Sequence, residues 1–173
     1  MPASQSPPRE SFVTRRFGLP AVLAIIVILL DQLTKLVIVR QWPTGSRQVV
    51  IPHFFHLVHL RNTGAAWGLF SGATLILALL SVLVLAFLIW KFTSLTEGYP
   101  ERAVAIGMIA GGIVGNLIDR IWRGEVVDFL LFFFRSYHWP AFNIADSAIC
   151  CGVVLFIAST FFRGENQEKA QGA

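Results

Sequence analysis

The sequence predicts an α-helical integral membrane protein with four transmembrane helices and a small β-sheet outside the membrane. Of its 173 residues, 55% are hydrophobic and only 14% are charged, whereas soluble domains contain about 25% charged residues. Four apolar segments approach or reach the roughly 20 residues that a helix needs to cross a bilayer core. Between the first two lies a polar stretch rich in β-branched and aromatic residues. Lipid is therefore the predicted solvent for most of the chain.

Residues 1–18 are polar and rich in Pro and Ser, which predicts a disordered tail. Arg15-Arg16 before an apolar run is also typical of export signals. That run, however, continues to Val39 without a small-residue cleavage site, so residues 19–39 are predicted to be a retained first span. Within it, Asp31 and Lys35 are four residues apart and can pair on one helix face. Such a pair is either purely structural or braces a functional site.

The next segment is too polar to span, and its residues 42–71 are predicted to form the β-sheet, ending in a turn at Asn62-Thr63-Gly64. His53, His56 and His59 raise the question of a metal site. In a strand, however, His56 points away from the other two. No acidic residue or cysteine lies nearby in the sequence to complete a ligand set, and we therefore predict no metal.

The second span is predicted at residues 72–92 and carries almost no polar side chains, which is typical of a wall facing lipid. After a short polar loop at 93–101, a third span begins near Arg102. Its glycines recur every four residues and form a smooth strip that lets another backbone approach closely. The far end of this helix turns polar, with Asn116, Asp119 and Arg120.

Residues 129–135, FLLFFFR, are too short to span and are predicted to lie along the interface as an apolar lip. The fourth span follows at residues 141–162, and residues 163–173 form a polar tail. Asn143 and Asp146 are three residues apart and share a face of this helix. The adjacent Cys150 and Cys151 are expected to pack as small hydrophobic residues, because a disulfide between neighbours is strained.

Two carboxylates stand where apolar spans leave the membrane. Asp128 follows the third span and Asp146 opens the fourth, so a hairpin would place both at one membrane face. Carboxylates near bilayer depth are costly and usually face a watery cavity. Two close carboxyls share one proton, so one can act as base on a water while the other polarises a carbonyl. This arrangement predicts aspartic-type peptide hydrolysis; a proton relay or transporter and a scaffold with structural carboxylates remain alternatives.

Further polar side chains could support such a reaction. Asn62, Asn116 and Asn143 can donate hydrogen bonds to substrate or to developing negative charge. Arg120 either neutralises Asp119 or binds the substrate backbone.

The chain also resembles the lipoprotein signal peptidases, which are the type II signal peptidases of bacteria. The resemblance covers roughly residues 19–162, with its motifs in the expected order and spacing. Trp67 stands where the family's motif is expected to have Phe, a change between two large aromatic residues. Five blocks carry the resemblance: Asp31–Lys35, Arg61–Trp67, Gly111–Arg120, Val126–Phe129 and Phe142–Asp146.

The resemblance implies an aspartic endopeptidase of the bacterial inner membrane, acting without cofactor. Such enzymes remove the signal peptide from prolipoproteins, cutting just before a cysteine that bears diacylglycerol. The implied fold has four transmembrane helices, an extracytoplasmic sheet and a short interfacial helix. The implied catalytic pair is Asp128 and Asp146. The implied supporting residues are Asp31, Lys35, Asn62, Gly64, Asn116, Arg120 and Asn143.

An even number of spans places both termini on one side of the membrane. Basic residues are almost equally numerous on the two sides, but Arg15-Arg16 before the first span favours cytoplasmic termini. The active site would then lie near the extracytoplasmic face. The net charge of +4 is spread along the chain without a basic stripe, so no nucleic-acid partner is expected. The expected partners are prolipoproteins and membrane lipids, with the chain acting as a monomer.

Overall fold

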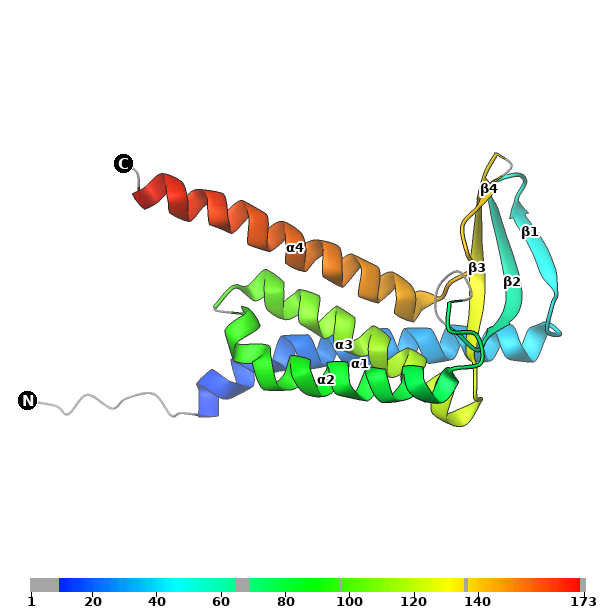
Figure 1. Ribbon diagram of the computed structural model, residues 1–173, viewed down its shortest axis with the longest axis horizontal. Helices are drawn as coiled ribbons and strands as arrows, with labels where there is room; N and C mark the ends of the chain where they lie inside the picture. The colour runs from blue at the N-terminus through cyan, green and yellow to red at the C-terminus, as the bar shows by residue number, and fades with distance from the viewer. Residues whose placement is uncertain (1–9, 65–68, 97, 136, 172–173) are drawn as a thin grey trace, which may run out of the picture.

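Four long helices form a bundle with a β-sheet at one end, as seen in a computed structural model that describes residues 10–64, 69–96, 98–135 and 137–171 (Figure 1). Each helix contains a segment long and apolar enough to cross a membrane. The four-span prediction is therefore confirmed. The helices are α1 (Glu10–Gln41), α2 (Thr74–Thr96), α3 (Pro100–Trp122) and α4 (Ile144–Gln171).

Helix α3 is the centre of the bundle because its glycines let two neighbours approach. A Cβ at Gly107 would lie 2.6 Å from the carbonyl oxygen of Pro20 in α1. A Cβ at Gly112 would lie 2.4 Å from the carbonyl oxygen of Ala145 in α4. These close backbone contacts bring the polar end of α3 against the start of α4, as the glycine strip predicts.

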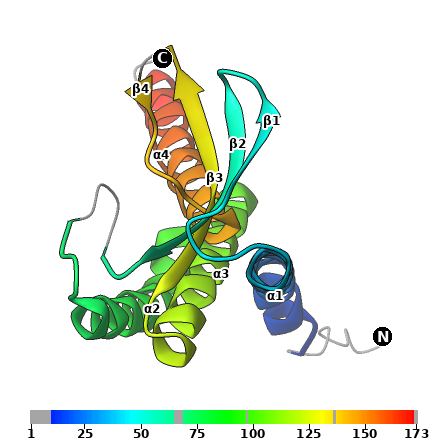
Figure 2. The same cartoon turned by 90° about the vertical axis from the view of Figure 1, so that its right-hand side faces the viewer.

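The sheet has four antiparallel strands in the order β1-β2-β3-β4 and stands across the bundle end (Figure 2). Strand β3 (Val126–Phe134) pairs along β2 (Phe55–Asn62), with Asn62 opposite Val126 and Leu60 opposite Asp128. Its Val127 and Phe129 pack with Ile38 of α1 in a small buried core. That core fixes β3, and with it Asp128, against the end of the first helix. The remaining strands are β1 (Arg47–Ile51) and β4 (Tyr137–His138).

The stretch after Asp128 is not a separate interfacial lip, and this prediction was wrong. Residues 129–134 belong to β3, and the described residues contain no short interfacial helix. The reason is that β2 has an edge left open by the β1–β2 hairpin, and an aromatic, β-prone segment closes it. Phe132 stacks on Phe55 of β2 at 4.7 Å between ring centroids.

The two ends of the chain are more helical than predicted. Helix α1 already begins at Glu10, inside the predicted disordered tail, and α4 continues to Gln171 through the predicted polar tail. Extending an existing helix adds one hydrogen bond per residue without a new nucleus, so polar residues can follow an apolar span. The start of α1 and the end of α4 lie at the bundle end opposite the sheet (Figure 1).

Candidate active site

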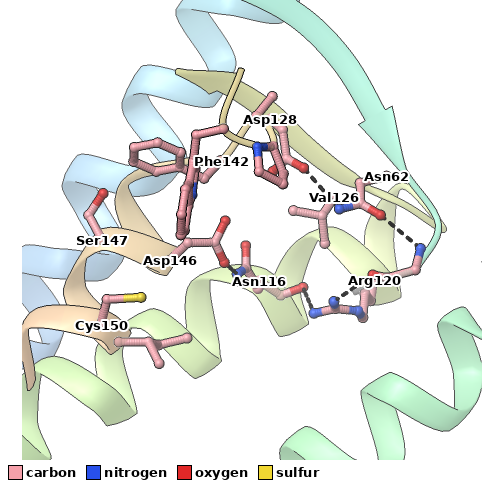
Figure 3. Close-up of a pocket in the computed structure, with 14 residues that line it drawn as sticks. Asn62, Asn116, Arg120, Val126, Asp128, Phe142, Asp146, Ser147 and Cys150 are labelled. Atoms are coloured by element: carbon pink, nitrogen blue, oxygen red, sulfur yellow. Dashed lines mark hydrogen bonds between the residues drawn. The ribbon is translucent and has the colours of Figure 1, made fainter. Parts of the chain in front are cut away.

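The two aspartates predicted from the sequence border one cavity of about 460 Å³. Asp128 comes from β3 and Asp146 from the first turn of α4, and both carboxyl groups border the same space in Figure 3. The cavity lies where the sheet meets the ends of the spans. Its lining consists of Asn62, Gly64, Asn116, Arg120, Val126, Asp128, Trp139, Pro140, Ala141, Phe142, Asp146, Ser147, Ile149 and Cys150.

Asp128 is buried, with 4% of its surface exposed, and its carboxyl accepts hydrogen bonds from two amides. Asn62 Nδ2 donates to Oδ2 over 2.9 Å and Asn143 Nδ2 to Oδ1 over 2.8 Å. Burial, with the added repulsion of the Asp146 charge, raises the pKa of Asp128 to about 7 against the opposing effect of these donors. This carboxyl can therefore gain or lose a proton near neutral pH.

Asp146 is held by the start of its own helix. Asn143 precedes α4, and its Oδ1 accepts from the Asp146 backbone N–H over 2.9 Å. In return Asp146 Oδ2 accepts from the Asn143 backbone N–H over 3.2 Å, which makes a reciprocal capping box. Asn116 Nδ2 donates to the other oxygen, Oδ1, over 2.7 Å. The carboxylate orientation is thus fixed from two elements.

Asn143 joins the two aspartates. Its side-chain oxygen caps the helix that carries Asp146, while its side-chain nitrogen donates to Asp128. The same nitrogen also lies 3.2 Å from Asn116 Oδ1. Asn143 is completely buried, so its amide is a fixed spacer between the two carboxyl groups.

The turn after β2 fixes the remaining donors. The Gly64 N–H donates to Asn62 Oδ1 over 2.9 Å, which orients the Asn62 amide so that its nitrogen faces Asp128. Arg120 Nη2 donates to the Gly64 carbonyl over 3.3 Å. A Cβ at Gly64 would lie 2.5 Å from the Leu69 carbonyl, so no other residue fits this turn without a shift.

A separate group of charges lies behind the cavity. Lys35 Nζ donates to Asp31 Oδ2 over 2.8 Å, to Asp119 Oδ2 over 2.9 Å and to Asn116 Oδ1 over 2.9 Å. Lys35, Asp31 and Asp119 are completely buried, and Arg123 also pairs with Asp119. We call Asp31, Lys35 and Asp119 the ion cluster.

The ion cluster also holds the backbone beside each aspartate of the cavity. Asp31 Oδ1 accepts from the N–H of Ala145, which precedes Asp146. Asp119 Oδ2 accepts from the N–H of Val127, which precedes Asp128. The cluster therefore connects α1 and α3 to both chain segments that carry the aspartates.

The chain is similar in sequence to known proteins over most of its length. The sequence pattern of the family described as Signal peptidase (SPase) II matches residues 23–162, which is most of the chain. The chain belongs to the signal peptidase II family. A lipoprotein signal peptidase of Bacillus pumilus (strain SAFR-032) is 38% identical over 149 residues, covering 86% of this chain and 96% of that protein. The chain is thus a peptidase of a family that removes signal peptides from prolipoproteins.

Two solved structures share the fold of this signal peptidase II family member. Both are described as bacterial membrane enzymes determined by the in meso method. One, at 2.3 Å resolution, has a TM-score of 0.81 and 36% sequence identity, covering 86% of this chain and 91% of its own. The other, at 1.9 Å, has a TM-score of 0.75 and 38% identity, covering 83% and 92%. The helices and sheet therefore have the arrangement of a bacterial membrane enzyme.

The site residues predicted from the sequence lie close together, some lining the cavity and others buried behind it. Asn62, Gly64, Asn116 and Arg120 line the cavity with the two aspartates. Asn143 is buried between them, and Asp31 and Lys35 lie behind in the ion cluster. Trp67, the one departure from the expected motif, lies outside the described residues.

Sequence reasoning missed Asp119 as a partner of Lys35 and missed Cys150 as a lining residue. Cys150 and Cys151 are both exposed on the protein surface, so the expectation that they pack inside was wrong. Cys150 is four residues after Asp146 and so lies on the same helix face, which the spacing could have shown. The pairing of Asp119 with Lys35 could not be predicted without knowing that α1 packs against α3.

The three histidines have separate surroundings. His53 lies in the turn between β1 and β2. His56 is buried against Phe133 and accepts a hydrogen bond from Arg47; burial and the nearby Arg47 charge lower the pKa of the imidazole. His59 Nδ1 lies 2.8 Å from the Trp42 carbonyl. Among the described residues, no three or more His, Cys, Asp or Glu side chains gather as a metal site would require.

Proposed function

We propose that this chain is an aspartic endopeptidase of the bacterial inner membrane. It removes the signal peptide from diacylglyceryl-modified prolipoproteins and cuts just before the lipidated cysteine. One observation carries the proposal: two buried carboxyl groups from different elements border one cavity, and each is oriented by amide donors. The family relationship supports the substrate class.

Asp128 and Asp146 share one proton and activate a water between them. The raised pKa of Asp128 suits it to hold the proton, so Asp146 is the base. Asp146 takes a proton from the water as its oxygen attacks the scissile carbonyl carbon, and Asp128 protonates the carbonyl oxygen. When the tetrahedral intermediate collapses, the C–N bond breaks. The nitrogen leaves with the proton from Asp146, and Asp128 recovers its proton from the hydroxyl.

The supporting residues hold this pair and the substrate. Asn62 and Asn143 fix the Asp128 carboxyl, and Asn116 fixes Asp146. Arg120 lines the cavity beside Gly64, where a guanidinium can hold a carbonyl of the substrate backbone. Asp31 and Lys35 act behind them through the ion cluster.

The cavity wall suits an apolar substrate. Val126, Phe142, Ile149 and Trp139 are apolar or aromatic residues of its lining. A signal-peptide helix and two acyl chains can enter laterally from the bilayer and rest on this wall. The sulfur chemistry of the lipidated cysteine belongs to the substrate, and hydrolysis by two carboxyls requires neither cofactor nor metal.

The chain acts as a monomer with both termini in the cytoplasm. Helices α1 and α4 begin and end opposite the sheet, so cytoplasmic termini place the sheet and the cavity at the extracytoplasmic face (Figure 1). Prolipoproteins whose signal peptides are inserted from the cytoplasm present their cleavage site at that face.

Cleavage of a diacylglyceryl-modified prolipoprotein by the purified chain in micelles tests the proposal. Wild type is compared with Asp128→Asn and Asp146→Asn, each checked for folding, with and without a metal chelator. We expect each substitution to lower kcat by about 10³-fold or more, and the chelator to have no effect. Cleavage that survives both substitutions would place the catalytic site elsewhere. Proton flux in liposomes without any cleavage would favour a transporter.

A further inference from the structure

A second cavity, of about 290 Å³, lies on the other face of β3. Val126 and Asp128 face the first cavity, whereas Val127 between them faces the second, as the alternation of a strand requires. The second cavity is lined by Val39, His59, Arg61, Arg123, Glu125 and Val127.

His59 is one of the lining residues, and its imidazole is buried. The side chain is 2% exposed, and its Nε2 has no hydrogen-bond partner among the described residues. Its Nδ1 lies 2.8 Å from the Trp42 carbonyl, which can only accept, so Nδ1 carries the proton. In the neutral imidazole, Nε2 is then a buried acceptor that lacks a donor. Buried polar atoms are nearly always paired, so this one indicates a missing partner.

Two arginines line the cavity, and guanidinium groups are frequent partners of phosphate. Arg61 Nη1 pairs with Glu125 at 2.5 Å, and Arg123 pairs with Asp119. Each guanidinium has five N–H donors, so these pairs leave donors for a second acceptor. With both carboxylates counted, the four charges cancel. A ligand with a single phosphate charge, or a zwitterion, therefore suits the cavity better than a multiply charged anion.

The depth of the cavity points to a lipid. Val39 lies near the end of the α1 span, and Arg123 directly follows α3. The lining residues thus lie where two spans leave the hydrocarbon core, which is where phospholipid headgroups are found.

We propose that the second cavity binds the headgroup of a membrane phospholipid that carries a hydrogen-bond donor beside its phosphate. Arg61 and Arg123 hold the phosphodiester. The adjacent ammonium or hydroxyl, as in ethanolamine or glycerol headgroups, donates to His59 Nε2. Glu125 can receive a second bond from the same group. The lipid would rest on Val127, whose N–H is held by Asp119, directly beside Asp128.

Binding of short-chain phospholipids to the full chain in detergent micelles tests this site. Phosphatidylethanolamine and phosphatidylglycerol carry the donor, whereas phosphatidylcholine does not. The soluble compound sn-glycero-3-phosphoethanolamine has the same headgroup as phosphatidylethanolamine without its acyl chains. We expect the first two to bind about fivefold more tightly than phosphatidylcholine, the equivalent of one hydrogen bond. Their binding should also shift the ¹⁵N resonance of His59 Nε2.

Two variants separate the parts of the site. His59→Asn keeps a nitrogen near the Nδ1 position for the Trp42 carbonyl but removes Nε2, so it should abolish the preference over phosphatidylcholine. Arg61→Gln should weaken all three lipids by about tenfold; its side chain is 53% exposed, so folding should survive. The exposed His53→Asn and Arg135→Gln are matched controls and should bind as wild type does.

Three results would overturn the proposal. Equal affinity for all three lipids, unchanged in His59→Asn, would leave Nε2 bonded to water only. Equal affinity for phosphatidylethanolamine and sn-glycero-3-phosphoethanolamine would assign the cavity to a soluble phosphate ester. Binding that is lost equally in the control variants would show unspecific association with basic residues.

Discussion

The molecule contains two buried groups of carboxylates that are neighbours but differ in their partners. In the ion cluster, Asp31 and Asp119 contact the Lys35 ammonium directly. In the cavity, the hydrogen-bond donors to Asp128 and Asp146 are amides. A cation at contact distance balances the charge of a buried carboxylate. The amides around Asp128 carry no charge, and burial raises the pKa of this carboxyl to about 7. The same residue type is thus structural in one place and suited to chemistry in the other.

The largest effect on stability should come from Lys35→Met. This change leaves Asp31 buried without its cation and Asp119 with Arg123 alone. Removing one partner of a buried ion pair typically costs about 3–5 kcal/mol. The free energy of unfolding, measured by SDS titration in mixed micelles, should fall by that amount. Arg61→Met is the matched control, because its pair with Glu125 is 53% and 20% exposed and should contribute below about 1 kcal/mol. Equal losses in both variants would mean that the ion cluster is no more important than a surface pair.

Asn143 has a structural role and a role in the cavity, because it caps helix α4 and also donates to Asp128. Asn143→Ala should lower kcat by about 10²-fold, because Asp128 loses a donor and the spacing of the carboxyls relaxes. It should also cost about 1 kcal/mol through the lost cap. Both are measured on one preparation, by cleavage and by SDS unfolding.

Asn143→Ser separates the two roles. Serine is a good N-cap, so stability should return toward wild type, but its side chain is too short to reach Asp128. Cleavage should therefore stay low. Recovery of cleavage together with stability would show that Asn143 matters for helix α4 alone.

The sequence was sufficient to predict that Asp128 and Asp146 lie at the same end of the bundle, because carboxylates at the ends of apolar spans are rare and costly. It also predicted the four spans, whose length and hydropathy are local properties. The capping box at the start of α4 could also have been predicted, because Asn143 and Asp146 are spaced as an N-cap residue and the N3 residue.

The sequence did not predict how distant segments meet. Strand β3 was missed because its run of Phe and Leu shows no alternation, and its partner β2 lies on the other side of two helices in the chain. From the sequence, pairing of Asp119 with Arg120 was only one of two alternatives, the other being substrate binding by Arg120. In the fold Asp119 pairs with Lys35, because the glycine strip brings α1 against α3. The unpaired atom of His59 depends on the Trp42 carbonyl, which only the folded backbone places there.

The smallest expected effect concerns the pH dependence of cleavage. With the pKa of Asp128 raised to about 7, the shared proton is lost above that pH, so kcat should fall on the basic side. Asn62 donates to the ionised carboxyl and so lowers this pKa. Asn62→Ala should therefore move the basic limb to higher pH, by about one unit or less.

A pH–rate profile of kcat for wild type and Asn62→Ala measures this shift. Thr63→Ala is the control, because its hydroxyl contacts Ser71 and Gly72 rather than either aspartate, and its limb should not move. A basic limb that stays in place in Asn62→Ala would mean that a group other than Asp128 holds the proton. Asp146, oriented by the helix cap and by Asn116, would then be the acid, and the two carboxyls would exchange roles in an otherwise unchanged cavity.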